Sequence, residues 1–310
     1  MEEVLYASFF RVPELASGLS PIALAAPSQQ HEHQSTNHRF TSSLMDIRDL
    51  AAIDVHAHYG KWDQGPETAL LGEMMSGDAA TVIRRAQAAN TEWTVVSPLS
   101  GLMPRGCADA VAGNEEANSV VEQNPGLLQW VIVHPLQLAT FDQARERLQH
   151  PKCVGIKIHP EEHCYPIREH GRALFELAAE LDAVVLTHSG HENSIPDEFV
   201  TFADDHSNVQ LILAHIGCRT NAHSVDLQVR AVQASRHGNI FADTSSASSM
   251  CSGLIEWAVA EVGADHVLYG TDTPLYFAPS QRARIDAMDI PVEQKRLILR
   301  DNAERLLQLP

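Results

Sequence analysis

The feature that most constrains this chain is an alternation of short apolar runs with amphipathic stretches, which begins near residue 50. The runs are apolar on both faces, as buried parallel strands are, and the stretches between them show helical spacing. Strands that alternate with helices predict parallel pairing through βαβ units. The runs lie at residues 51–58, 93–99, 128–135, 153–160, 183–190, 209–217, 239–245 and 266–274.

Eight such units predict a single-domain α/β fold, the (β/α)8 TIM barrel. The alternative is a doubly wound open sheet, which should carry a glycine-rich phosphate turn after its first strand. The sequence HAHYGKW follows that strand instead, so the barrel is favoured. The helices are expected at residues 79–90, 114–123, 140–149, 168–181, 195–205, 224–237, 248–262, 280–288 and 292–307.

The start of the chain differs from the rest. The segment APSQQHEHQSTNHRFTSS is polar and lacks periodicity, which predicts a disordered extension over residues 1–44 before a folded domain of residues 45–310. His31 and His33 have no predicted strand or helix beneath them, and we interpret them as solvated side chains. The first residues are acidic and a proline interrupts their apolar run, so a signal peptide is not expected.

Net charge and cysteine content limit which partners the protein can bind and in which compartment it is expected. The formal net charge of −18 should repel nucleic acids and anionic membrane surfaces. No apolar run approaches the roughly 18 residues of a membrane span. The five cysteines are widely spread without a C-x-x-C pair, which argues against a disulfide framework or a zinc ribbon and favours a cytoplasmic location. A small-molecule substrate is therefore expected, and homo-oligomer formation is left open.

Polar side chains gather at the ends of the predicted strands, where barrel enzymes form their active sites. His56 and His58 end the first run, and residues i and i+2 of a strand face the same side. Ser97 and Asp243 end the second and seventh runs and are less informative. The remaining strand ends carry His134, Lys157, His159, His188, His215 and Asp272.

Imidazole and carboxylate groups at these positions suggest a metal centre. His56, His58, His188 and Asp272 supply three nitrogens and one oxygen, a ligand set suited to a divalent ion, with zinc expected. A structural zinc site would contain cysteine and lie close together in the sequence. This set is dispersed and holds no sulfur, which favours a catalytic ion with a position open to water or substrate.

The motifs DVHAH, GIKIHP, LTHSG, LAHIG, YGTDTP and the closing DNAERLL occur in this order. Together they resemble the amidohydrolase-related branch of the amidohydrolase superfamily over residues 50–310. The resemblance implies a metal-dependent TIM-barrel enzyme with ligands on the four residues just named. It places His215 at a position that is a second-metal ligand in some subgroups and an acid or base beside a single ion in others.

The branch includes hydrolases and decarboxylases, so the resemblance implies more than one reaction. The leading prediction is hydrolysis of an ester, lactone or amide by a metal-activated water, with Asp272 as the base and His215 stabilising the oxyanion or transferring a proton. The alternative is non-oxidative decarboxylation of an aromatic or unsaturated carboxylic acid, in which His215 protonates carbon. A non-catalytic metal-binding barrel is disfavoured because every polar position that the chemistry needs is present.

The chemical state of Lys157 decides both how many ions the site can hold and whether the lysine can bind an anionic substrate. A carboxylated Lys157 would bridge two ions, with His215 on the second, whereas an ammonium would repel a second cation and bind an anionic substrate or Asp272. We expect the single-ion form. In the loops, Trp62 is predicted to wall the pocket and Arg105 to bind an anion, unless Arg105 is a surface residue. His159 is predicted to contact substrate or orient Lys157.

Overall fold

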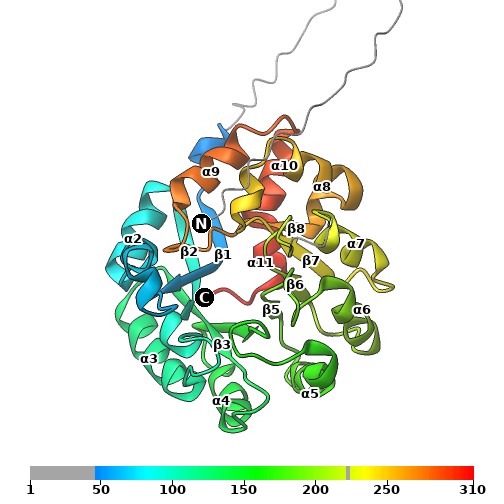
Figure 1. Ribbon diagram of the computed structural model, residues 1–310. Coiled ribbons are helices and arrows are strands. Elements are labelled where there is room, and N and C mark those ends of the chain that lie inside the picture. The colour runs from blue at the N-terminus through cyan, green and yellow to red at the C-terminus, as the bar shows by residue number, and fades with distance from the viewer. Residues whose placement is uncertain (1–45, 221–223) are drawn as a thin grey trace, which may run out of the picture. The chain divides into compact units, whose positions relative to one another are not determined.

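The computed structural model describes residues 46–220 and 224–310. The predicted extension over residues 1–44, with His31 and His33, lies outside these residues. Within them, eight parallel strands pair in chain order, and helices surround the strands as in a (β/α)8 barrel (Figure 1). The predicted fold is confirmed. The strands are β1 (Ala52–Tyr59), β2 (Thr91–Pro98), β3 (Leu127–Ile132), β4 (Cys153–Ile158), β5 (Val185–Thr187), β6 (Leu211–Leu213), β7 (Ile240–Asp243) and β8 (Val267–Leu268).

Each predicted helical stretch contains a helix, with two differences. The stretch at 248–262 holds a short turn and then a helix that begins only after Gly253, which has a φ of 82°. The stretch at 292–307 is divided by a π-helical turn, Leu297–Asp301. The helices are α1 (Ala69–Met75), α2 (Ala79–Ala88), α3 (Ala110–Gln123), α4 (Ala139–Arg147), α5 (Ile167–Glu180), α6 (Pro196–Asp205), α7 (Leu227–Ala234), α8 (Leu254–Val262), α9 (Ala278–Asp286), α10 (Val292–Arg296) and α11 (Asn302–Leu306).

Helix α1 was not predicted. It lies in the loop after β1, and its apolar residues Leu70, Leu71 and Met74 are exposed rather than turned toward the core. A helix of seven residues whose apolar side chains face solvent gives no periodic signal of a buried face.

An apolar layer fills the barrel at the amino-terminal ends of the strands. Ile53 and Val55 of β1 pack there with Val95 of β2 and with residues of the later strands. Ala303 of α11 and Leu307 just after it belong to the same buried cluster. The carboxyl-terminal segment therefore closes this end of the barrel.

A β-bulge in β1 separates this apolar layer from the residues above it. Asp54 and Ala57 pair with Thr94 and Val96, so β1 contains one residue more than β2 over this interval. An extra residue reverses which side chains face inward. Ile53 and Val55 point into the barrel below the bulge, and the even-numbered His56 and His58 point into it above.

The barrel closes between β1 and the segment after β8. Val55 N donates to Tyr269 O at 3.0 Å, and His58 N donates to Thr273 O at 2.6 Å. Asp272 N donates to the carbonyl of His56 at 2.7 Å. The residues predicted to bind metal on the first and last strands are therefore neighbours because the barrel closes there.

All five cysteines are free, so no disulfide framework supports the fold. None of the helices in the described parts of the chain is long and apolar enough to cross a bilayer.

Candidate metal centre

His56 and His58 are buried at the carboxyl end of β1, and both have the same arrangement of ring partners. His56 Nδ1 lies 2.8 Å from Asp243 Oδ2, and His58 Nδ1 lies 3.0 Å from the carbonyl of Ser97. Since these partners accept hydrogen bonds, each Nδ1 carries the proton and each Nε2 keeps a lone pair. Such outer partners fix the tautomer and orientation of metal-binding histidines.

Asp272 faces both of these Nε2 atoms. Its Oδ1 lies 3.1 Å from His58 Nε2 and 3.7 Å from His56 Nε2. Burial raises the pKa of Asp272, while the nearby His58 ring opposes that shift. Its backbone has a φ of 56°, and that of His215 a φ of 73°. Non-glycine residues rarely adopt this left-handed conformation, and such conformations cluster at functional sites.

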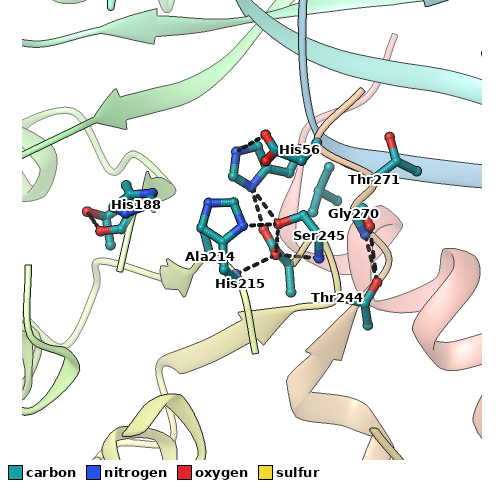
Figure 2. Close-up of polar contacts among 12 residues, drawn as sticks. His56, His188, Ala214, His215, Thr244, Ser245, Gly270 and Thr271 are labelled. Carbon is teal, nitrogen blue, oxygen red and sulfur yellow. Dashed lines mark hydrogen bonds and ion pairs between the residues drawn. The ribbon is translucent and has the colours of Figure 1, made fainter. Parts of the chain in front are cut away.

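Ser245 and Asp243 connect His56 with His215. Ser245 Oγ lies 2.7 Å from His215 Nδ1 and 3.1 Å from His56 Nδ1, and Figure 2 shows it between the two rings. Asp243 Oδ1 accepts from the backbone N–H of His215 at 2.9 Å and of Ser245 at 3.0 Å. Donor atoms of His56, His215 and Asp272 all lie within 4.8 Å of one another. These three residues and His58, whose Nε2 lies beside Asp272, are called the first centre below.

Asp54, Asp243 and Ser245 received no role from the sequence. Asp54 Oδ1 accepts from the backbone N–H of His56 and of Thr271, each at 3.1 Å, so it joins the β1 bulge to the segment after β8. Burial raises the pKa of Asp54 to about 7. The available signal was weak: Asp54 interrupts an apolar run, and Asp243 ends one.

His188 borders the first centre, next to His215. Its Nε2 lies 2.6 Å from Nδ1 of His191, and its ring centre lies 4.9 Å from that of His215. The ring of His159 stacks on that of His188, with ring centres 4.4 Å apart. His188 forms a second group with His191 and Cys218, whose donor atoms also lie within 4.8 Å of one another.

Burial determines the charge of these imidazoles. It lowers the pKa of His56, His188 and His215 well below the usual range, so the rings are neutral at pH 7. Neutral imidazole is the form that binds metals, and a carboxylate such as Asp272 is the natural anionic partner. The residues present therefore fit a divalent ion.

Lys157 of β4 is fully buried within the same group. Its Nζ donates to His56 Nε2 at 3.0 Å. Burial lowers the pKa of Lys157 to about 8, while the carboxylates of Asp272 and Asp243 oppose the shift. The amine therefore lies against His56, a predicted ligand, whereas the sequence analysis paired an unmodified Lys157 with an anionic substrate or Asp272.

A pocket of about 230 Å³ opens onto the centre. Trp62, Arg105 and His159, the predicted substrate contacts, all line it. Arg105 forms ion pairs with Glu161 and, at 3.9 Å, with Glu162, so its charge is already neutralised. Trp62 lies in an apolar wall of the pocket, and the substrate contacts of Arg105 and Trp62 stay predictions. The other apolar lining residues are Leu99, Leu102, Met103, Leu275 and Tyr276.

Solved structures with the same fold are known. A 2,6-dihydroxybenzoate decarboxylase from Rhizobium superposes with a TM-score of 0.64 at 15% identity, over 83% of this chain and 98% of that one. A manganese-bound 5-carboxyvanillate decarboxylase from Novosphingobium aromaticivorans gives 0.63 at 13% identity, over 84% and 96%. A Staphylococcus aureus protein described as an amidohydrolase gives 0.59 at 15% identity, over 84% and 100%. At these identities the likeness shows the fold alone.

Sequence comparison gives the family. None of the curated proteins matches the chain. The family model described as Amidohydrolase matches residues 53–309, which span the barrel from β1 to the carboxyl-terminal segment. The match agrees with the resemblance carried by the strand-end motifs, and the chain belongs to the amidohydrolase family.

Proposed function

We propose that this protein is a metal-dependent hydrolase of a small ester, lactone or amide. The observation that carries the proposal is the position of Asp272, a buried carboxylate that lines the pocket and faces Nε2 of both His56 and His58. A carboxylate in this place can bind an ion and also reach a water molecule in the pocket.

The ion would be held by His56, His58 and Asp272, with His188 as the fourth ligand. Zinc and manganese both suit nitrogen and oxygen donors, and manganese is bound in one of the similar structures. When bound, such an ion acts as a Lewis acid toward a carbonyl and makes water more acidic.

The protein's own residues would handle the protons. Asp272 accepts a proton from the attacking water at a carboxylate oxygen and returns it to the leaving group. Ser245 holds Nδ1 of His215, which leaves Nε2 of His215 to stabilise the oxyanion or to transfer a proton. The apolar wall around Trp62 excludes bulk water from the substrate.

We propose that the first centre holds one ion rather than two. Lys157 lies 3.0 Å from a predicted ligand atom, and as an ammonium it would repel a second cation nearby. Metal analysis should then give the same stoichiometry for the wild type and Lys157→Gln. A fall from two ions to one would show instead that Lys157 is carboxylated.

Decarboxylation is the second candidate, and the similar solved structures favour it. Two of the three named above are decarboxylases of aromatic acids, and an apolar wall with Trp62 and Tyr276 suits an aromatic ring. In that reaction Nε2 of His215 would deliver the proton to carbon after loss of CO₂.

The test is product analysis on metal-loaded full-length protein. A panel of esters, lactones, amides and hydroxybenzoic acids is assayed for new carboxylate and for CO₂. New carboxylate without CO₂ supports hydrolysis, and CO₂ release supports the second candidate. Asp272→Asn should lower kcat about 10³-fold or more, while Asp289→Asn, an exposed control, should not change it. A loss below tenfold, about 1.4 kcal/mol, would remove Asp272 from its central role.

A further inference from the structure

Two turns with similar sequences follow β5 and β6. Residues 188–191 read His-Ser-Gly-His and residues 215–218 read His-Ile-Gly-Cys, and the glycine in each has a positive φ, of 106° and 86°. Because β5 and β6 are paired in parallel, the turns lie side by side. His191 and Cys218 occupy the same last position of their turns.

The two turns are held in contact by the scaffold. A Cβ on Gly190 would lie 2.3 Å from the carbonyl oxygen of Cys218, so only glycine allows this approach. Gln228 of α7 is fully buried and donates to Ser189 Oγ and to the carbonyl of Cys218, each at 3.1 Å. It also accepts from Gly217 N at 3.2 Å. The side chains that these turns carry are therefore held in place by a rigid second layer.

His188, His191 and Cys218 all line the pocket. Nδ1 of His191 lies 2.6 Å from Nε2 of His188 and 3.9 Å from Sγ of Cys218. The first centre contains nitrogen and oxygen donors only. This group adds a sulfur, which changes the class of ion that it prefers.

We propose that His188, His191 and Cys218 form a second metal site, for a thiophilic divalent ion such as Zn²⁺ or Cd²⁺, on the pocket wall beside the first centre. Two imidazoles and a thiolate are a typical ligand set for such ions, and three protein ligands leave a position that faces the pocket. The site goes beyond the proposed hydrolase function and does not depend on it.

The surroundings of the thiol set the chemistry of binding. Burial, followed by the nearby carboxylate of Asp272, raises the pKa of the Cys218 thiol to about 11, so the thiol is protonated at pH 7. Binding forms a sulfur–metal bond and releases that proton to solvent. The carboxylates of Asp272 and Glu161 favour a cation at Cys218, while the guanidinium of Arg219 opposes them.

His188 is a candidate ligand of both centres, so an ion at the second site would compete with the first for this residue. Hard ions such as Mn²⁺ avoid thiolates and should populate the first centre alone. Thiophilic ions should populate both.

The experiment uses full-length protein freed of metal by a chelator, loaded with one equivalent of Mn²⁺ and then titrated with Cd²⁺. The readout is the near-ultraviolet absorption from charge transfer between sulfur and cadmium, which the sulfur-free first centre cannot produce. The wild type should show a band that saturates near one added equivalent. Cys218→Ser should abolish it, and His191→Gln should weaken Cd²⁺ binding about tenfold or more.

Cys107→Ser and Cys251→Ser are the matched controls, since both cysteines are exposed and lie outside the pocket. Both variants should keep the band. A wild type without the band, or a Cys218→Ser variant that retains it, would overturn the proposal.

A second readout covers the case in which Cys218→Ser does not fold, which circular dichroism would show. In the wild type, Cd²⁺ should slow alkylation of Cys218, mapped by mass spectrometry, and leave that of Cys107 unchanged. Equal rates with and without Cd²⁺ would refute the site. No substrate is present in either assay, so failure of the hydrolase proposal would not affect these results.

Discussion

The two ends of the barrel interior are built from different chemistry on the same strands. At the amino-terminal end, Ile53 and Val55 of β1 lie in an apolar cluster that Leu307 helps to close. At the carboxyl-terminal end of the same strand, His56 and His58 face a carboxylate and a network of hydrogen bonds. One extra residue in β1 separates the apolar cluster, called the lower layer below, from the layer of His56 and His58, called the upper layer.

This difference indicates that one end of the barrel supplies stability and the other supplies the chemistry. The lower layer stabilises the fold by burying apolar surface, and a polar group without a partner would destabilise it. The upper layer instead keeps lone pairs available for a ligand. Substitutions in the upper layer should therefore change metal binding and catalysis with the fold intact. Substitutions in the lower layer should change stability with the chemistry intact.

The largest expected effect is the loss of metal in His56→Ala and in His58→Ala. Each change removes an Nε2 donor that faces Asp272, so bound metal measured after gel filtration should fall below detection and turnover should stop. His31→Ala and His33→Ala are the controls and should retain full metal content. Equal occupancy in all four variants would contradict the assignment of the upper layer as a metal centre.

A smaller effect is expected for Asp243→Asn. Asp243 accepts hydrogen bonds from Nδ1 of His56 and from the backbone N–H of His215, so it positions both residues without lining the pocket. Losing such an outer partner of a metal ligand weakens binding about 10- to 100-fold. Competition with a chelator of known affinity measures this change, and Asp289→Asn should show none. Unchanged affinity would mean that Asp243 supports the fold and not the centre.

Periodicity was sufficient to predict the barrel, because eight buried parallel strands and their helices repeat one pattern. All eight apolar runs contain strands, but β5, β6 and β8 have only three, three and two residues. Hydropathy cannot distinguish these strands from the buried turns that follow them. Helix α1 was missed for the opposite reason, because its apolar residues are exposed.

The candidate site was predictable only in part. The strand-end rule found His56, His58, His215 and Asp272, which the structure brings together. It could not find the β1 bulge, since a bulge depends on pairing with β2 rather than on local sequence. It also could not show that Nε2 of His188 lies within hydrogen-bond distance of His191. The conformation of the turn after β5 decides whether the His188 ring faces His191 or the first centre.

The lower layer is tested by Leu307→Ala. Leu307 is 3% exposed and packs with the apolar ends of the strands, so truncation leaves a cavity. The free energy of unfolding should fall by about 2–4 kcal/mol in denaturant titrations. Metal content and kcat per folded molecule should be unchanged.

Leu138→Ala is the matched control, because Leu138 is 71% exposed and should change stability by less than about 0.5 kcal/mol. A Leu307→Ala variant that keeps its stability but loses metal would show that the two layers are coupled rather than separate.

The smallest expected effect belongs to removal of residues 1–44, which should leave both layers intact. The start of the barrel domain is anchored from within: the buried Arg282 of α9 donates to the carbonyls of Ile47 at 2.8 Å and Leu50 at 2.9 Å. Arg282 is itself held by Asp286 at 2.9 Å. We therefore expect the free energy of unfolding to change by less than about 0.5 kcal/mol, and metal content not at all.

Arg282→Leu in the full-length chain gives the comparison for this deletion. It removes the anchor and the hydrogen bonds that the buried guanidinium donates to the carbonyls of Ile47 and Leu50, which should cost about 1–3 kcal/mol in a denaturant titration. If the deletion costs as much as Arg282→Leu, residues 1–44 contribute to the fold and the domain boundary near residue 45 is wrong. If the deletion instead lowers metal content at unchanged stability, the first 44 residues act on the upper layer alone.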